Sequence, residues 1–289
     1  MPEGDTLRRL AMLIDERFAG QVVRRSTMRD PRLVGVDLTD RTLVEADAYG
    51  KHLFVRFDDR RTLHAHLLTT GSFSVGRPSQ EPEWKRRVEL WFDGGRLTAE
   101  SVPVLDVLAT ADEHAITDHL GPDLCAVSGP PDPVEIAGRL IAAPDEPLTG
   151  ALLDQRCVAG FGNIYVNEVP YIVGVNPHQP VGAIDGLAEL VAIGTALIRT
   201  NAERGPQNTT GRRLATAARW VHGVRRGRCP VCGAELQYLN AAHSPWGRSI
   251  TWCPDCQPLS ARRAVDLVRT RHLIGPHPAA RQLVLPRQI

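Results

Sequence analysis

The sequence predicts an α+β fold in which a mostly β part precedes a mostly helical part. Short apolar and β-branched runs follow one another from about residue 21 to 108, whereas the periodicity from residue 133 to 221 is helical. Two Cys-x-x-Cys pairs, with 20 residues between them, are typical of a zinc-binding hairpin. A chain of 289 residues, 43% of them hydrophobic, is long enough for two domains with their own cores.

The β part begins with a helix predicted over residues 6 to 18, which we expect to pin the amino terminus against a core. After Asp5 and Thr6, which suit a helix start, apolar side chains recur at helical spacing: Leu7, Leu10, Leu13, Ile14 and Phe18. Strand-like runs follow, separated by Asp-Arg, Gly-Gly and proline-containing turns: Leu43-Val44, Leu53–Phe57, Val88–Phe92 and Val102–Leu108. This pattern favours an antiparallel sandwich or barrel.

Residues 128–133, with Gly129 and three prolines, are typical of a linker between domains predicted at 1–127 and 134–222. Helices are predicted in the second domain at these ranges: 134–142, 150–159, 164–173 and 186–204. A zinc finger at 223–257 and a tail at 258–289 complete the chain. The tail is rich in arginine and proline, with one candidate helix near residues 261–272.

Charge is distributed unevenly, although the formal net charge is only +1. Residues 1–200 contain 20 basic and 29 acidic side chains, whereas residues 201–289 contain 14 and 4. Such a basic C-terminal part suggests a polyanionic partner such as nucleic acid, with a solvated basic face as the alternative. The absence of a membrane-length apolar run and of a signal-peptide pattern predicts a cytosolic protein without a membrane partner.

The chain starts Met1-Pro2-Glu3-Gly4-Asp5, and removal of Met1 would expose a secondary amine beside a carboxylate. A free α-amino group has a pKa of about 8, against about 10.4 for lysine, so more of it is unprotonated at neutral pH. The pair is therefore suited to imine-forming catalysis. The alternative is that Pro2 and Glu3 form only a processed, exposed end.

Lysine is rare in this chain, because all 34 basic residues except Lys51 and Lys85 are arginine. Lys51 lies in Tyr49-Gly50-Lys51-His52-Leu53, directly before a predicted strand. Lysine can give up its proton where arginine stays charged, which makes Lys51 a candidate for chemistry. An ordinary surface lysine at a strand start is the alternative.

The cysteine pairs have the spacing that brings four thiolates round one tetrahedral zinc ion: Cys229, Cys232, Cys253 and Cys256. Since four thiolates complete the coordination, we expect the metal to be structural and not catalytic. Disulfides are the poorer alternative in a cytosolic protein. Cys125 and Cys157 are predicted to be ordinary buried thiols.

Two further segments are suited to binding phosphate. The turn Gly160-Phe161-Gly162-Asn163 precedes a predicted helix, whose N-terminal amides together with Asn163 would hold an anion. A plain helix-turn-helix with Asn163 as N-cap is the alternative. Between the cysteine pairs, Arg248 stands at a tight glycine turn from which its guanidinium can grip a phosphate backbone, with a solvated hairpin arginine as the alternative.

Together these residues resemble the formamidopyrimidine-DNA glycosylase and endonuclease VIII family of base-excision repair enzymes. Its hallmarks are an N-terminal Pro-Glu-Gly, a helix-two-turn-helix with a Gly-x-Gly-Asn-x-Tyr-x-x-Glu signature, and a zinc finger reading Arg-x-x-x-x-Cys-x-x-Cys-Gln. The matches run in order from Pro2 to Gln257. The resemblance implies a helix-capped β-sandwich, a helix-two-turn-helix domain and a zinc-finger hairpin with one structural zinc ion. It also implies a monomer that binds damaged DNA, duplex or single-stranded, in the nucleoid of a bacterial cytoplasm.

The resemblance further implies site residues and a mechanism. Pro2 would be the nucleophile and Glu3 the acid. Lys51 would contact the lesion-strand phosphate or assist elimination, and Asn163 and Arg248 would grip phosphates flanking the flipped nucleotide, so that Lys51 and Arg248 serve both catalysis and binding. With the nucleotide rotated out of the duplex, Pro2 would attack C1′ while Glu3 protonates the ring oxygen. Elimination of the 3′ and then the 5′ phosphate would leave a one-nucleotide gap.

The sequence departs from the formamidopyrimidine branch in two segments that fill the hole left by the flipped base. Thr69 stands in the first, His66–Gly71, where methionine is expected, and the second, Glu100–Asp106, has no arginine or phenylalanine. This favours the endonuclease VIII branch, hence oxidised pyrimidines over 8-oxoguanine, and leaves open a preference for single-stranded or bubble DNA.

Two rivals remain from other classes of protein. One is a non-catalytic zinc-finger protein that binds kinked or abasic DNA, which would need neither Pro2 nor Glu3. The other is a zinc-ribbon module of an RNA-processing enzyme, which would leave Pro2, Asn163 and Lys51 unexplained.

Overall fold

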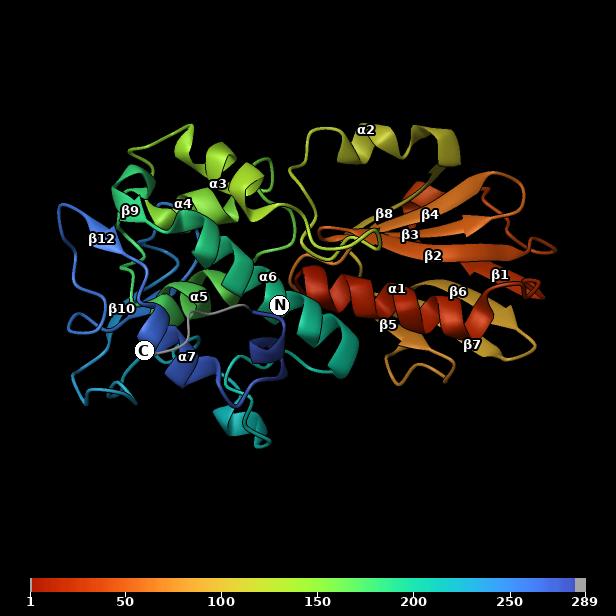
Figure 1. Cartoon of the computed structure of the whole chain (residues 1–289). Helices are drawn as coiled ribbons and strands as arrows, with labels where there is room; N and C mark the ends of the chain where they lie inside the picture. The colour runs from red at the N-terminus through yellow and green to blue at the C-terminus, as the bar shows by residue number, and fades with distance from the viewer. Residues whose placement is uncertain (1, 284–289) are drawn as a thin grey trace. The chain divides into compact units, whose positions relative to one another are not determined.

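The computed structural model describes residues 2–283, which divide into two compact units between His119 and Leu120. Figure 1 shows the first unit from red to yellow and the second from green to blue. The division precedes the linker predicted at 128–133, because the chain after Leu120 already bonds to the second unit: the Gly121 N–H donates to Gln155 O at 2.8 Å. Met1, with its predicted removal, and residues 284–289 of the tail lie outside the described residues.

The N-terminal unit is a sandwich of two four-stranded sheets, ordered β1-β6-β7-β5 and β2-β3-β4-β8 (Figure 1). All strand pairs in the two sheets are antiparallel. The strands are β1 (Arg25–Met28), β2 (Leu43–Tyr49), β3 (His52–Phe57), β4 (Arg61–His66), β5 (Ser72–Val75), β6 (Arg86–Phe92), β7 (Gly95–Glu100) and β8 (Val104–Ala109). The α+β fold with its antiparallel sandwich is confirmed.

The core of this unit lies under helix α1 (Gly4–Phe18), which confirms the predicted first helix. Four of its side chains are completely buried: Leu7, Ala11, Ile14 and Phe18. Each large apolar side chain buried in this way stabilises the fold by about 1.5–3 kcal/mol. Leu13 was expected on this face and is instead 43% exposed, because Ala11 occupies the buried stripe on that side of the helix.

Two short helical turns lie between strands, η1 (Pro31–Leu33) and η2 (Glu83–Lys85), and two follow the last strand of this unit, η3 (Thr110–Asp112) and α2 (His114–Thr117). The two segments that depart from the formamidopyrimidine branch are both tight turns. Residues 67–71 join β4 to β5, and only Ser101–Pro103 join β7 to β8. Leu68 and Ser101 lie in these turns with φ of 47° and 50°, a conformation that costs a non-glycine residue about 1–3 kcal/mol.

The C-terminal unit packs its core around four helices, α3 (Pro133–Ile141), α4 (Leu148–Leu153), α5 (Tyr165–Val173) and α6 (Leu187–Arg204). The helix predicted at 150–159 is wrong in its extent, since α4 ends at Leu153. Asp154 stops it by accepting the Arg156 N–H with its side chain at 2.9 Å, and the chain then turns through Gly160 at φ +119°.

The zinc-finger segment and the tail fold onto this unit. The hairpin consists of β10 (Gln237–Leu239) and β11 (Ile250–Trp252), and the tail contributes β12 (Arg263–Ala264), α7 (Leu267–Ile274) and η6 (Pro278–Arg281). The remaining elements are η4 (Val181–Ala183), β9 (Ile184–Asp185) and η5 (Ala215–Ala217). The helix predicted at 261–272 starts late, because β12 pairs with β9 and Asp266 then caps α7 by accepting the Arg269 N–H at 2.8 Å. Within residues 2–283, no helix combines the length and the apolar character that a membrane span requires.

Candidate functional site

The first helix fixes the predicted nucleophile and acid at one point of the N-terminal unit. Glu3 is the N-cap residue of α1, with extended backbone angles of φ −126° and ψ −176°. Its carbonyl accepts the N–H groups of Thr6 and Leu7 at 2.9 and 3.1 Å, so the helix start holds Glu3 in place. Glu3 is completely buried and Pro2 is half-buried. A buried carboxyl beside a partly accessible proline is the arrangement that acid catalysis next to an amine nucleophile needs.

Lys51 lies in the two-residue turn between β2 and β3, where Gly50 has φ +55°. It is half-buried, and it stands beside a cluster of three histidines on β3 and β4. His52 Nδ1 is 2.9 Å from His64 Nε2, and the ring of His66 meets that of His52 edge-on at 4.8 Å. The sequence reasoning missed this cluster, although the hairpin register that pairs His52 with His66 would have indicated it.

These histidines are held neutral. Burial, assisted by the positive charges around it, lowers the pKa of His52 to about 3. Burial and then the charge of Lys51 lower the pKa of His66 to about 4. At neutral pH the rings are therefore uncharged, and Lys51 supplies positive charge to this turn for an anionic ligand.

Asn163 lies two residues before α5 and does not cap it. Ile164 occupies the N-cap position without a side-chain cap, so the N-cap alternative for Asn163 is wrong. Asn163 is 8% exposed, and its side-chain oxygen is buried without a hydrogen-bond partner within residues 2–283. Because buried polar atoms are rarely left unpaired, this oxygen marks Asn163 as a candidate for a functional role.

Arg248 lies at the tip of the β10–β11 hairpin and is exposed. The preceding residue, Gly247, has φ +61°, and a side chain there would meet no atom within 4 Å. The turn therefore needs glycine for its backbone conformation and leaves open space beside Arg248. The guanidinium makes a local contact, in which Nη1 donates to Gly247 O at 3.1 Å.

Asn167 connects the Asn163 turn to the Arg248 hairpin, and the sequence reasoning missed it. Its side-chain N–H groups donate to Asn163 O at 2.7 Å and to Ser249 O at 3.2 Å. Its side-chain oxygen accepts the Thr251 N–H at 2.7 Å. One buried amide thus fixes both predicted phosphate-binding positions in a single framework.

Glu168, the last residue of the helix-two-turn-helix signature, organises the segment before the zinc finger. The carboxylate is completely buried and accepts the backbone N–H groups of Trp220, Val221 and His222 at 2.7, 2.8 and 2.7 Å. It also accepts the Thr209 hydroxyl. A carboxylate with four donors can remain buried and charged, so Glu168 serves the local structure.

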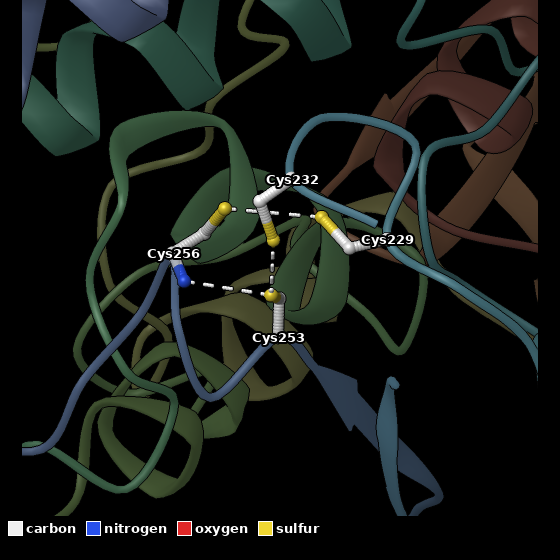
Figure 2. A group of neighbouring side chains, drawn as sticks. All are labelled: Cys229, Cys232, Cys253 and Cys256. Carbon is white, nitrogen blue, oxygen red and sulfur yellow. Dashed lines mark hydrogen bonds between the residues drawn. The ribbon is translucent and has the colours of Figure 1, made fainter. Parts of the chain in front are cut away.

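The four predicted metal ligands converge on one point (Figure 2). All four sulfur atoms lie within 4.8 Å of one another, with 3.8 Å between Cys229 and Cys256 and 3.4 Å between Cys232 and Cys253. A tetrahedral zinc ion with Zn–S bonds of about 2.3 Å places its sulfur ligands about 3.8 Å apart, so the group fits zinc. The other thiols differ from each other: Cys125 is buried as predicted, whereas Cys157 is only half-buried, which corrects that prediction.

The predicted site residues therefore form two groups. Pro2, Glu3 and Lys51 belong to the N-terminal unit, and Asn163, Arg248 and the four cysteines belong to the C-terminal unit. Hydrogen bonds at the start of α1 hold Glu3 in the first group, and the Asn167 amide holds the backbone at Asn163 and Ser249 in the second.

Comparisons with known proteins identify the family. Residues 1–101 match the model of the formamidopyrimidine-DNA glycosylase N-terminal domain, and residues 131–199 match that of its H2TH domain. The chain is 38% identical over 270 residues to the probable endonuclease 8 2 of Streptomyces coelicolor, covering 91% of this chain and 96% of that protein. It is 34% identical over 262 residues to a DNA-(apurinic or apyrimidinic site) lyase of Mycolicibacterium smegmatis, covering 90% of this chain and all of that one.

The fold is also that of a solved glycosylase. The formamidopyrimidine-DNA glycosylase of Lactococcus lactis, bound to DNA with an AP site, superposes with a TM-score of 0.73 at 22% identity and covers 89% of this chain and 99% of its own. The two family models together match more than half of this chain. The chain therefore belongs to the formamidopyrimidine-DNA glycosylase and endonuclease VIII family of DNA-repair enzymes, and it is a DNA glycosylase and AP lyase.

Proposed function

We propose that this enzyme removes oxidised bases, pyrimidines in preference to 8-oxoguanine, and then cleaves the DNA strand at the abasic site by β,δ-elimination. The observation that carries the proposal is the burial of Glu3 at the N-cap of α1, directly after the partly exposed Pro2. A carboxyl that only capped a helix would be expected at the surface. A carboxyl that gives a proton to a reacting group next to an amine nucleophile is expected inside the site and not at the surface.

The chemistry follows from these two groups. Once Met1 is removed, the lone pair of the Pro2 nitrogen attacks C1′ of the deoxyribose, and the bond from C1′ to the damaged base breaks. The base leaves with the bonding electron pair and takes up a proton, while the proline nitrogen gives up its own. Glu3 protonates the ring oxygen, the sugar opens, and an iminium joins Pro2 to C1′. The iminium makes the C2′ proton acidic, so loss of that proton expels the 3′ phosphate. A second elimination expels the 5′ phosphate, and water then releases the proline.

The remaining predicted residues would hold the DNA. Lys51 supplies a cation at the β2–β3 turn, Asn163 supplies an unpartnered amide oxygen beside its side-chain N–H donors, and Arg248 projects from the hairpin. Phosphate oxygens accept hydrogen bonds, so the N–H donors of these side chains are the groups that would bind them. The four cysteines would hold a zinc ion that fixes the hairpin and takes no part in the reaction.

The preference for pyrimidines rests on the two turns of the N-terminal unit. Thr69 occupies the position of the expected methionine, and the three-residue β7–β8 connection contains neither an arginine nor a phenylalanine. The relative from Streptomyces coelicolor, named as an endonuclease 8, supports the same branch. Cytosolic localisation and a monomeric state remain expectations from the sequence.

Borohydride trapping tests the proposal. The purified enzyme, with Met1 removal verified by mass spectrometry, is incubated with oligonucleotides that contain 5-hydroxyuracil, 8-oxoguanine or an abasic site. We expect a covalent adduct that Pro2→Gly abolishes and Glu3→Gln strongly reduces on base-containing substrates. Glu16→Gln, an exposed carboxyl on the same helix, is the control and should trap normally. Tight DNA binding without any adduct would favour the non-catalytic alternative, and faster reaction with 8-oxoguanine would overturn the pyrimidine preference.

A further inference from the structure

A groove of about 910 Å³ opens on the N-terminal unit, lined in part by the two turns in which the sequence departs from the formamidopyrimidine branch, and it contains neither Pro2, Glu3 nor Lys51. Its walls are the η2 turn on one side and the β7–β8 turn on the other, with Trp84, Arg87, Arg32, Thr70 and Ser101 among the lining residues. Trp84 is 71% exposed and is the one aromatic residue among the exposed large hydrophobic side chains of residues 2–283. A tryptophan that leaves its large apolar surface in water often marks a place where a ligand or partner covers it.

The charged side chains of the groove differ in whether they already form ion pairs within the protein. Arg32 is neutralised by Asp30, whose carboxylate it contacts with two nitrogens at 2.8 Å, and it also donates to Pro103 O. Lys85 is paired with Glu81 at 2.7 Å. Arg87 is half-buried, and within the described residues no hydrogen bond or ion pair of its guanidinium is found. Its charge does help lower the pKa of Asp30, after the larger effect of Arg32.

The wall opposite Trp84 is rigid and strained. The Ser101 N–H donates to Lys85 O at 2.8 Å, which ties this strained residue to η2. On its other side, Ser101 O accepts the Thr70 hydroxyl at 3.4 Å. Gly71 packs so closely that a side chain there would lie 3.1 Å from Val102 Cα. Strain held by several contacts in this way is typical of sites that present groups to a ligand.

We propose that this groove binds one unpaired nucleotide of a DNA strand, with its base stacked on Trp84 and its phosphate held by Arg87. An aromatic face next to an unpaired cation is the combination with which proteins bind single-stranded nucleic acid. The ammonium group of Lys85, which is paired with Glu81, lies 5.4 Å from the centre of the Trp84 ring, so Arg87 is the charge left for a phosphate. In a stacked duplex the base faces are covered, so Trp84 selects for a strand that is single or locally unpaired.

The inference rests on the assignment of DNA as substrate and adds a second contact to it. It predicts that the enzyme holds single-stranded or bubble DNA with Trp84 and Arg87, which take no part in the reaction of Pro2 and Glu3. An acidic segment of a partner protein is the other occupant that the charge would admit, and with that occupant single-strand DNA binding would stay at the wild-type level in both Trp84→Ala and Arg87→Gln.

The test measures binding of a labelled lesion-free oligothymidylate and of a labelled duplex of matched length. Trp84→Ala should weaken single-strand binding by about tenfold or more, as expected for loss of one stacked base, and should change duplex binding less. Trp84→Phe should retain most of the affinity because it keeps an aromatic face. Val44→Ala removes another exposed apolar side chain, on β2, and should leave both affinities unchanged.

The charge is tested through the dependence of binding on salt. Arg87→Gln should reduce the slope of log affinity against log salt by about 0.7 on single-stranded DNA, the value for one phosphate contact. Arg87→Lys should restore it, and Arg60→Gln, which changes an exposed arginine of the β3–β4 turn, should leave it unchanged.

Two outcomes overturn the inference while leaving the proposed reaction intact. In the first, both Trp84→Ala and Arg87→Gln bind single-stranded DNA as tightly as the wild type. In the second, Trp84→Ala loses duplex affinity and single-strand affinity to the same extent. Borohydride trapping on an abasic duplex at saturating protein should be normal in both variants. Absence of an adduct with the wild-type enzyme would instead refute the proposed reaction. The DNA affinities of the variants would still test whether the groove binds an unpaired nucleotide.

Discussion

The side-chain oxygen of Asn167 accepts the backbone N–H of Thr251 at 2.7 Å, and this bond joins α5 to the zinc-finger hairpin across 84 residues of sequence. Both residues are almost completely buried, at 2% exposure each. Because the Asn167 amide also donates to Asn163 O and Ser249 O, the positions of Asn163 and Arg248 depend on one side chain.

Asn167→Ala should therefore lower both stability and DNA affinity. The substitution leaves buried backbone groups of Asn163, Ser249 and Thr251 without this partner, and each such group costs about 1–3 kcal/mol. Urea denaturation followed by tryptophan fluorescence measures the first effect, and binding to abasic duplex measures the second. Asn240→Ala alters an exposed asparagine at the same hairpin and should be nearly neutral. Wild-type DNA affinity in Asn167→Ala would contradict the proposed phosphate-binding role of the framework.

Glu168→Gln should strongly destabilise the segment before the zinc finger, although glutamine and glutamate have nearly the same shape. A glutamine has one acceptor oxygen and directs an NH₂ group at donors of the backbone, so at least one N–H of residues 220–222 loses its partner. Hydrogen bonds to a charged group contribute about 1.5–3 kcal/mol each, which sets the expected loss. The control is Glu189→Gln, which changes an exposed carboxyl on α6. The denaturation midpoints of the two variants are compared with each other. Equal midpoints would show that the carboxylate does not organise this segment.

The zinc ligands give a third prediction. Cys232→Ser should lower bound zinc, measured by elemental analysis, from one ion per chain to much less, and it should abolish tight DNA binding. The β-sandwich has a separate core in the N-terminal unit, so its strands should keep their protection against hydrogen exchange. Cys157→Ser, which changes a half-buried thiol outside the cluster, should retain full zinc content and DNA affinity. Full zinc content in Cys232→Ser would overturn the four-thiolate site.

Local patterns predicted the fold better than the site. The apolar spacing of the first helix, the strand-like runs and the cysteine pairs each depend on neighbouring residues, and the structure confirms the fold that they indicated. The exact ends of α4 and α7 were wrong, because Asp154 and Asp266 stop or start a helix through side-chain bonds that compete with the apolar pattern.

The site residues that the sequence did not reveal act through contacts between distant segments. Asn167 contacts residues more than 80 positions away, and no local pattern indicates that partner. The histidine cluster arises from strand register, which places His52 opposite His66. Trp84 and Arg87 look like ordinary residues of a turn and a strand start, and only the folded groove brings them together with Thr70 and Ser101.

The histidines predict a pH dependence of stability. The pKa of His66 is about 4 in the folded chain, below its ordinary value of 6.5, so between these values the unfolded chain binds a proton that the folded chain does not. The contribution of neutral His66 to the free energy of unfolding is therefore fully present above pH 6.5 and is lost as the pH falls towards 4. The groups that face it are Lys51, His52 and His64, with His119 acting on His52.

Urea denaturation at several pH values across this range measures the effect. The stability of the wild type should fall as the pH is lowered, and His66→Gln should show a shallower fall because one of the protonation sites is gone. His243→Gln removes an exposed histidine and should follow the wild type. Identical slopes in wild type and His66→Gln would show that His66 is not held neutral by the fold.

The tail gives the last prediction, because it braces the metal site. Arg269 donates from Nε to Tyr171 O at 3.1 Å, and its guanidinium lies 4.7 Å from the centre of the Tyr171 ring. The Tyr171 hydroxyl in turn lies 3.2 Å from Cys229 Sγ. Arg269→Ala removes a hydrogen bond and a cation–π contact, together about 1–3 kcal/mol, and frees Tyr171 to move away from the thiolate.

Arg269→Ala should consequently lose zinc to a chelator faster than the wild type, while its zinc content before chelation is unchanged. The release is followed with a colorimetric zinc indicator in excess chelator. Arg281→Ala, which alters an exposed arginine in η6 of the same tail, should release zinc at the wild-type rate. A chain truncated after Gln257 should release zinc at least as fast as Arg269→Ala, since it also lacks Arg263, whose Nε donates to Gly174 O at 3.0 Å directly after α5. Wild-type release from both variants would mean that the tail packs beside the metal site without stabilising it.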